Sequence, residues 1–193
     1  MRRRRGGLDF SRRKKKVNMA IVKEVLTWTV EILITLLVSF TFVYFIGLRT
    51  SVVGQSMAPT LNGGDEILVN RFVYKVTNPK PNDIIVFLPN GNEKSHYYVK
   101  RVVAVPGDQV LIADGVLYVN GEPYEEETEV TPMEDAGLAA EEITLGENEF
   151  FVLGDNRNNS EDSRYANIGS IKKEYIIGKA WFRIAPFHDF GFI

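Results

Sequence analysis

The chain has 193 residues, enough for one domain with its own hydrophobic core plus an appendage. It has no cysteine, which excludes a disulfide framework, a thiol nucleophile, an iron–sulfur cluster and a cysteine-ligated zinc site. Two histidines are too few for a histidine-rich metal site, so we expect neither a metal nor another cofactor.

The net charge of −2 hides a basic segment at the N-terminus, residues 1–24, on an otherwise acidic chain. Residues 1–23 hold ten Lys and Arg, and Asp9 is their one acidic residue. Such an arm can bind nucleic acid, but this one runs directly into hydrophobic sequence. We therefore expect a lipid bilayer, and no nucleic acid, as its partner.

The apolar stretch VLTWTVEILITLLVSFTFVYFIGL, residues 25–48, predicts a transmembrane helix. It is long enough to cross about 30 Å of hydrocarbon, and Glu31 is its one charge. Because the basic residues precede it, the N-terminus should be cytoplasmic and residues 49–193 extracytoplasmic, in a single-pass protein of the cell membrane. A cleaved signal peptide would have a shorter apolar core and would end at a small-x-small cleavage site, and FIGLRTSVV offers no convincing one. A buried core helix would need helices to pack against, and none is predicted downstream.

Residues 49–193 predict a mostly antiparallel β domain. The candidate strands are short and rich in β-branched and aromatic residues; they are residues 66–74, 83–88, 96–105, 109–124, 150–154 and 175–187. Asp114-Gly115 and Asn120-Gly121 are two-residue turn signals that predict tight hairpins. Residues 122–149 hold eleven acids and no Lys or Arg, which predicts a solvated acidic insertion.

The stretch VVGQSMAPTL places Ser56 in a turn bounded by Pro59, shortly after the apolar segment. A turn serine is common and can be purely structural. As a nucleophile it needs a base. The sequence GQSMA lacks the final glycine of a G-x-S-x-G elbow, which argues against a Ser-His-Asp hydrolase. The other known base for such a serine is a neutral lysine.

Lys100, in YYVKRVVAV, is the candidate base. Its strand is apolar on both faces, and Tyr98 and Val102 share its side by the period-2 alternation of a strand. Burial there would favour the neutral amine, which can accept a proton from a hydroxyl. A lysine on a half-exposed strand is the plainer alternative.

The stretch GDNRNNSEDSR, residues 154–164, follows an apolar strand and is dense in polar side chains. As a calcium loop it fails, because Arg157 would occupy a ligand position. So many donors and acceptors indicate a hydrogen-bonded network that positions other groups, although an ordinary polar loop has the same composition.

The motifs SMAPT, KRVVAVPGD and GDNRNNSEDSR, in this order behind an N-terminal anchor, resemble the three boxes of the bacterial type I signal peptidases. The likeness covers the whole chain and is closest to the single-anchor forms of Gram-positive bacteria. It implies an antiparallel β-sheet catalytic domain and a membrane-anchored serine endopeptidase. Such an enzyme removes signal peptides from exported precursors, cutting after small residues at −1 and −3. The resemblance also admits the protein translocase as a partner.

The resemblance implies a role for each matched residue. Ser56 would be the nucleophile, with its backbone N–H serving the oxyanion, Lys100 the general base, and Ser160 the hydroxyl that orients the lysine. Four residues would support the site: Asp155, Asp162, Arg164 and, paired with Asp155, Arg101. Four would line the pockets for substrate side chains: Met57, Leu61, Tyr98 and Val99. Gly54 stands where some members have a serine that helps the oxyanion hole, so the second oxyanion donor is open.

Two other functions remain at this stage. A self-cleaving repressor-type protease also uses a Ser/Lys pair, but that class is soluble, which argues against it here. An inactive relative that binds precursors would be expected to lose Ser56 or Lys100, and both are present.

Overall fold

The computed structural model describes residues 18–126 and 130–193, apart from the side chains at positions 42, 45 and 46. The chain divides into two compact units, Met1–Thr41 and Phe42–Ile193, which are described separately below.

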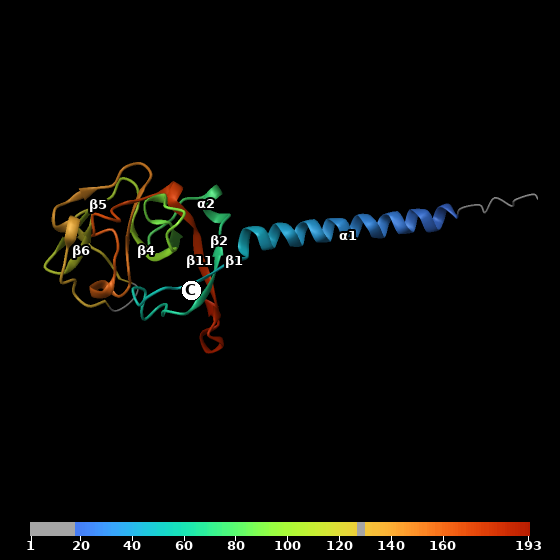
Figure 1. The fold of residues 1–193 in the computed structure, drawn as a ribbon. Coiled ribbons are helices and arrows are strands. Elements are labelled where there is room, and N and C mark those ends of the chain that lie inside the picture. Colours follow the sequence, from blue (N-terminus) through green and yellow to red (C-terminus); the bar gives the residue numbers. More distant parts are fainter. Residues whose placement is uncertain (1–17, 127–129) are drawn as a thin grey trace, which may run out of the picture. The chain divides into compact units, whose positions relative to one another are not determined.

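The helix α1 covers Met19–Ile46 and so includes most of the predicted apolar segment (Figure 1). Its threonines do not interrupt it, because each hydroxyl donates a hydrogen bond to the carbonyl one turn earlier, as Thr29 does to Val25 and Thr35 to Glu31. In the part of the chain that the structure describes, no helix is both long and apolar enough to cross a membrane. The prediction of a membrane-spanning helix is therefore not confirmed.

The larger sheet has eight strands in the order β1-β2-β11-β3-β4-β9-β10, with β12 paired to β11. Every pairing among them is antiparallel, so the predicted mostly antiparallel β fold is confirmed. The strands are β1 Leu48–Ser51, β2 Glu66–Asn70, β3 Ile84–Phe87, β4 Tyr98–Ala104, β9 Glu149–Leu153, β10 Ile171–Lys172, β11 Ile176–Ala185 and β12 Gly191–Phe192.

The smaller sheet has four strands in the order β7-β6-β5-β8. They are β5 Gln109–Ala113, β6 Val116–Val119, β7 Glu122–Pro123 and β8 Ile143–Thr144. The predicted hairpin turns are confirmed: Asp114 and Gly115 have φ of 51° and 76°, and Asn120 and Gly121 have φ of 55° and 81°. Two successive positive φ values define the turn whose twist matches a tight hairpin.

The short helices lie in the connections. They are α2 Val73–Val76 and the 3-10 turns η1 Pro89–Gly91, η2 Gly137–Ala140, η3 Arg157–Asn159, η4 Lys173–Tyr175 and η5 Phe187–Asp189. Helix α2 corrects the prediction of one strand over residues 66–74. The strand stops at Asn70, because the Asn70 side chain accepts hydrogen bonds from the backbone N–H groups of Phe72 and Val73 and turns the chain into a helix.

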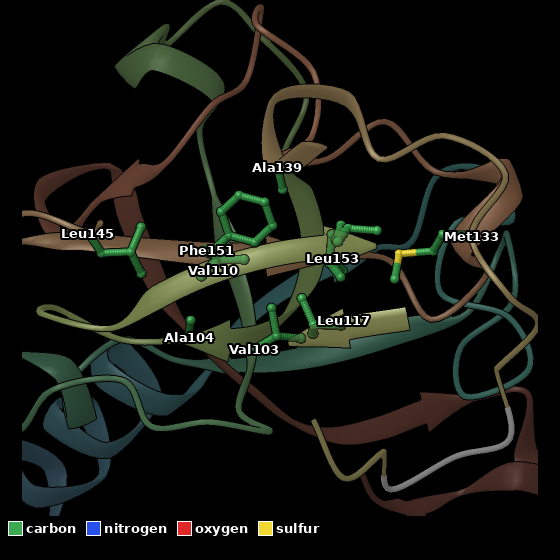
Figure 2. Packing of buried hydrophobic residues seen from close by; sticks show 10 residues of the cluster. Val103, Ala104, Val110, Leu117, Met133, Ala139, Leu145, Phe151 and Leu153 are labelled. Carbon is green, nitrogen blue, oxygen red and sulfur yellow. The ribbon is translucent and has the colours of Figure 1, made fainter. Parts of the chain in front are cut away.

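The acidic segment, residues 122–149, is not simply a solvated loop. Met133, Ala139 and Leu145 are buried in the cluster that joins the two sheets, together with residues of β4, β5, β6 and β9. Figure 2 shows Met133 and Leu145 at opposite ends of this cluster, with Phe151 and Val110 between them. The high acid count concealed these apolar residues, which anchor the segment to the domain.

Candidate active site

Ser56 lies in the connection between β1 and β2, which folds back on itself as a compact turn. The Leu61 N–H donates to the Met57 carbonyl at 2.9 Å, and the Val52 N–H donates to the Asp65 carbonyl at 2.8 Å. Gly54 begins the turn with φ of +79°, a left-handed conformation that residues with a side chain rarely adopt. The backbone geometry therefore explains why glycine stands at this position. Because glycine has no side chain, position 54 cannot supply a side-chain donor to the oxyanion.

Lys100 reaches this turn from β4 and meets the serine. Its Nζ lies 2.6 Å from the Ser56 Oγ, which is hydrogen-bonding distance. Only 4% of Lys100 is exposed, and the ring of Tyr98, on the same side of the strand, lies 5.6 Å from the Nζ. The structure thus brings together the two residues that the sequence proposed as nucleophile and base.

Burial lowers the pKa of Lys100 from its ordinary value to about 8. The carboxylates of Asp162, Glu161 and Asp155 oppose the shift by favouring the ammonium form, and Arg164 adds to it by repulsion. A substantial fraction of Lys100 is therefore the neutral amine near pH 8, as a general base requires.

We expect the activity to follow the titration of Lys100. The neutral fraction of the amine falls about tenfold for each pH unit below the pKa, so kcat/KM should fall as the pH drops below about 8 and level off above it. The measurement is kcat/KM of the full chain from about pH 6 to pH 10. A profile that stays flat into the acid range would rule out Lys100 as the base.

The stretch 154–164, here called the active-site loop, is held by two buried ion pairs. Arg101, next to Lys100 in β4, binds Asp155 through its Nε and Nη2, both at 2.8 Å, as predicted. Asp162 is fully buried and accepts from the Arg164 Nε at 2.8 Å and from the Gly154 N–H at 3.1 Å. The first pair fixes the loop to the strand of Lys100, and the second closes the loop on itself.

The loop also contacts the serine turn directly, through two residues that were not singled out from the sequence. The Asn156 N–H donates to the Ser56 carbonyl at 3.0 Å, and the Asn156 side chain donates to the Gln55 carbonyl at 3.2 Å. A Cβ on Gly154 would lie 2.4 Å from the Ser56 carbonyl oxygen and 2.2 Å from the Ser160 Oγ. The close approach of loop and turn therefore requires glycine at position 154.

Ser160 is buried beside Gly154, but the predicted contact with the lysine is not formed in this structure. Its Oγ has no hydrogen-bond partner within residues 18–126 and 130–193. The hydroxyl is free to rotate, so an acceptor or donor that arrives nearby could bind it.

Of the residues predicted to line substrate pockets, Met57 and Leu61 are fully buried in one core cluster with Val99. Tyr98 is half-buried, and its hydroxyl donates to Glu161 in the active-site loop at 2.9 Å. The structure also contains a separate cavity of about 550 Å³, which the sequence did not predict. It is lined by Val53, Ser95, His96 and Tyr97, among others, from the stretches that lead into Ser56 and Lys100.

No group of three or more His, Asp or Glu side chains among the described residues could hold a metal ion. The site contains a hydroxyl on a turn and a buried amine on a strand, in contact with each other. The active-site loop links the two elements, through the Arg101–Asp155 ion pair to the strand and a backbone hydrogen bond to the turn. This arrangement is that of a serine hydrolase with a lysine base.

Comparison with known proteins agrees with this class. Residues 25–185 match the family model described as signal peptidase, peptidase S26. Signal peptidase IB of Staphylococcus aureus strain COL is 35% identical over 185 residues, 87% of this chain and 93% of the relative. A probable signal peptidase I-1 of Synechocystis is 33% identical over 166 residues, 83% and 82% of the two chains. The chain therefore belongs to the signal peptidase family, peptidase S26, as its three motifs predicted.

A solved structure is also similar in sequence. The crystal structure of a signal peptidase I from Enterococcus faecalis is 30% identical, covers 54% of this chain and 97% of that chain, and gives a TM-score of 0.41.

Proposed function

We propose that this serine endopeptidase removes N-terminal signal peptides from exported precursors, with Ser56 as the nucleophile and Lys100 as the general base. The observation that carries the proposal is the contact of 2.6 Å between the Lys100 Nζ and the Ser56 Oγ. A serine hydroxyl attacks only when its proton has an acceptor, and the buried amine is placed to take it.

The reaction follows from this contact. Neutral Lys100 takes the proton of Ser56 as the Oγ bonds to the peptide carbonyl carbon, and the backbone N–H of Ser56 binds the resulting oxyanion. The ammonium then protonates the leaving amine as the C–N bond breaks, which leaves an ester on Ser56. Neutral again, Lys100 takes a proton from water, which attacks the ester carbonyl; breaking of the ester bond returns the proton to Ser56.

The supporting residues act by position. Arg101 with Asp155 holds the active-site loop against the strand of Lys100, and Arg164 with Asp162 closes the loop on itself. Ser160, with its hydroxyl buried and unbonded among the described residues, would rotate to bind the Nζ once Ser56 is acylated and no longer bonded to it. Such a bond would keep the amine aimed at the ester during the second half of the reaction.

The substrate side chains would be selected by size. We propose that Met57, Leu61, Tyr98 and Val99 form the walls of pockets for the residues at −1 and −3. Met57 and Leu61 are fully buried in the packed core beneath this surface. We therefore expect the pockets to be shallow. Only small residues such as alanine would then fit.

The test of this specificity uses one secretory precursor with alanine at −1 and −3, mixed with the purified full chain. Replacing the −1 alanine by tyrosine is expected to lower kcat/KM at least about a hundredfold, because a large side chain cannot enter a shallow pocket. The matched control places tyrosine at −2. Equal cleavage of the −1 variant and the parent precursor would contradict the pocket assignment.

We also propose that residues 25–48 anchor the enzyme in the cell membrane, with residues 1–24 cytoplasmic and 49–193 extracytoplasmic. The sequence supports this proposal, because an apolar stretch of this length follows ten basic residues. Ser56 would then be tethered within about 25 Å of the end of the anchor.

The full chain is accordingly expected to stay in the membrane pellet after extraction with alkaline carbonate. A Leu36→Arg variant is the matched comparison, because a charge at the centre of the segment opposes insertion by about 3 kcal/mol and should release part of the protein. Complete release of the parent chain by carbonate would contradict the anchor, since it would show that the protein is attached only to the membrane surface.

A further inference from the structure

The acidic segment docks on the active-site loop through a buried arginine. The Arg157 side chain is 1% exposed, and its Nη1 and Nη2 lie 2.6 and 2.7 Å from the two carboxylate oxygens of Glu126. Glu126 is itself only 20% exposed. Two parallel, charge-assisted hydrogen bonds fix both the distance and the orientation of the guanidinium.

Arg157 also binds the backbone of the active-site loop next to Ser56. Its Nε donates to the Gly154 carbonyl at 3.1 Å. Gly154 is the residue that packs against the Ser56 carbonyl, and Asn156, between Gly154 and Arg157, donates to that same carbonyl. Glu126 is therefore connected to the backbone of Ser56 through Arg157 and Gly154.

Other contacts join the same two stretches of chain, so the docking does not depend on one side chain. The Asn158 side chain donates to the Pro132 carbonyl and accepts from the Glu134 N–H, each at 3.0 Å. The Leu138 N–H donates to the Arg164 carbonyl at 2.8 Å. Among these contacts between the acidic segment and the active-site loop, the Glu126–Arg157 pair is the one that joins a carboxylate to a buried cation.

We propose that Glu126 is a positioning residue of the peptidase site, which acts through Arg157 and Gly154 to hold the active-site loop against Ser56. The proposal rests on the proposed function for its kinetic consequences. Among the described residues, the structure gives Arg157 one ion pair, the one with Glu126. Without that carboxylate the buried guanidinium would lack its counter-charge and would be drawn towards solvent, pulling on the Gly154 carbonyl.

The first test is amide hydrogen exchange on the purified full chain. Glu126→Gln keeps the size of the side chain and removes the charge. We expect exchange of the amides in residues 154–160 to accelerate about tenfold, while exchange in the hairpin of residues 109–119 stays unchanged. Glu125→Gln, the same substitution at the neighbouring exposed acid, is the control and should match the parent.

The second test is the separation of kcat from KM at 25 °C for a precursor with alanine at −1 and −3. Glu126→Gln is expected to lower kcat about tenfold with KM changed less than about twofold, because the loop positions the nucleophile more than it binds substrate. Glu126→Asp, which keeps the charge, should recover part of kcat. The thermal unfolding midpoint of each variant shows that it is folded during the assay.

The outcomes are distinguishable. A lower unfolding midpoint with unchanged kcat and unchanged exchange at 154–160 would overturn the proposal, since Glu126 would then only stabilise the fold. If Glu126→Gln does not fold, Glu126→Asp takes its place. It should show faster exchange at residues 154–160 and a lower kcat, both by smaller factors. Exchange and kcat equal to those of the parent in Glu126→Asp would then overturn the proposal. If the parent itself does not cleave the precursor, the proposed function fails, while the exchange experiment still decides whether Glu126 holds the loop.

Discussion

Replacing Ser56 by alanine, or Lys100 by methionine, is expected to lower kcat/KM at least about 10³-fold, because either change removes half of a nucleophile–base pair that works as a unit. Ser56→Ala deletes the attacking oxygen. Lys100 is 4% exposed, and Lys100→Met keeps a long unbranched side chain at this buried position but removes the proton acceptor. The measurement is the rate of precursor cleavage by each purified variant.

The fold should survive both changes. Methionine fills much of the volume of lysine without a buried charge, so the thermal unfolding midpoint of Lys100→Met is expected to equal or exceed that of the parent. Lys94→Met, the same substitution at an exposed lysine, is the matched control and should retain full activity. If either Ser56→Ala or Lys100→Met cleaves at a rate near that of the parent, the Ser/Lys mechanism is wrong.

The second large effect is expected at Gly154, which the motif comparison had not singled out as a site residue. Alanine at this position would place its Cβ 2.2 Å from the Ser160 Oγ, 2.6 Å from the Ser160 Cβ and 2.4 Å from the Ser56 carbonyl oxygen. Real Cβ atoms do not approach other atoms so closely, so the active-site loop must move away from the serine turn. We expect a loss of about 1–3 kcal/mol in the free energy of unfolding, together with a fall in kcat of at least about a hundredfold.

Chemical denaturation and kinetic assays of Gly154→Ala measure these two effects. The control is Gly191→Ala, because a Cβ at Gly191 meets nothing within 4 Å and its φ is not in the left-handed region. Parent-like turnover in Gly154→Ala would show that the loop and the turn need not be in contact for catalysis.

The sequence proposed Ser56 and Lys100 from short motifs, and the structure places their side chains in contact. The apolar neighbours of Lys100 predicted its burial, which the structure confirms, and this burial is what lowers its pKa. The Arg101–Asp155 pair was also predicted, although 54 residues separate the two in the chain. It came from the resemblance to a family, since no pattern within one sequence identifies a partner so far away.

Other features could not be predicted from the sequence, because they depend on tertiary packing. The eleven acids of residues 122–149 predicted a solvated segment, yet Met133, Ala139 and Leu145 are buried, and Glu126 pairs with Arg157. The composition of a segment averages over its residues and conceals the few that pack. Likewise, nothing in the letters GDN shows that Gly154 touches Ser56, which lies almost a hundred residues earlier.

The strand expected over residues 66–74 was wrong for a local reason. Most residues of EILVNRFVY are β-branched, aromatic or otherwise apolar, which favours a strand. The Asn70 side chain nevertheless ends the strand and starts α2, because it accepts hydrogen bonds from two backbone N–H groups. Asparagine in a strand-like stretch was the available signal, and it had been outweighed by its β-branched neighbours.

The most direct test of the account is the mass of the new N-terminus that the full chain produces from one secretory precursor with alanine at −1 and −3. Cleavage after the −1 alanine by the parent protein, with intact precursor left by Ser56→Ala under the same conditions, is the predicted result. Cleavage at another bond, or an equal yield of the same fragment from Ser56→Ala, would contradict the claim that Ser56 and Lys100 remove signal peptides.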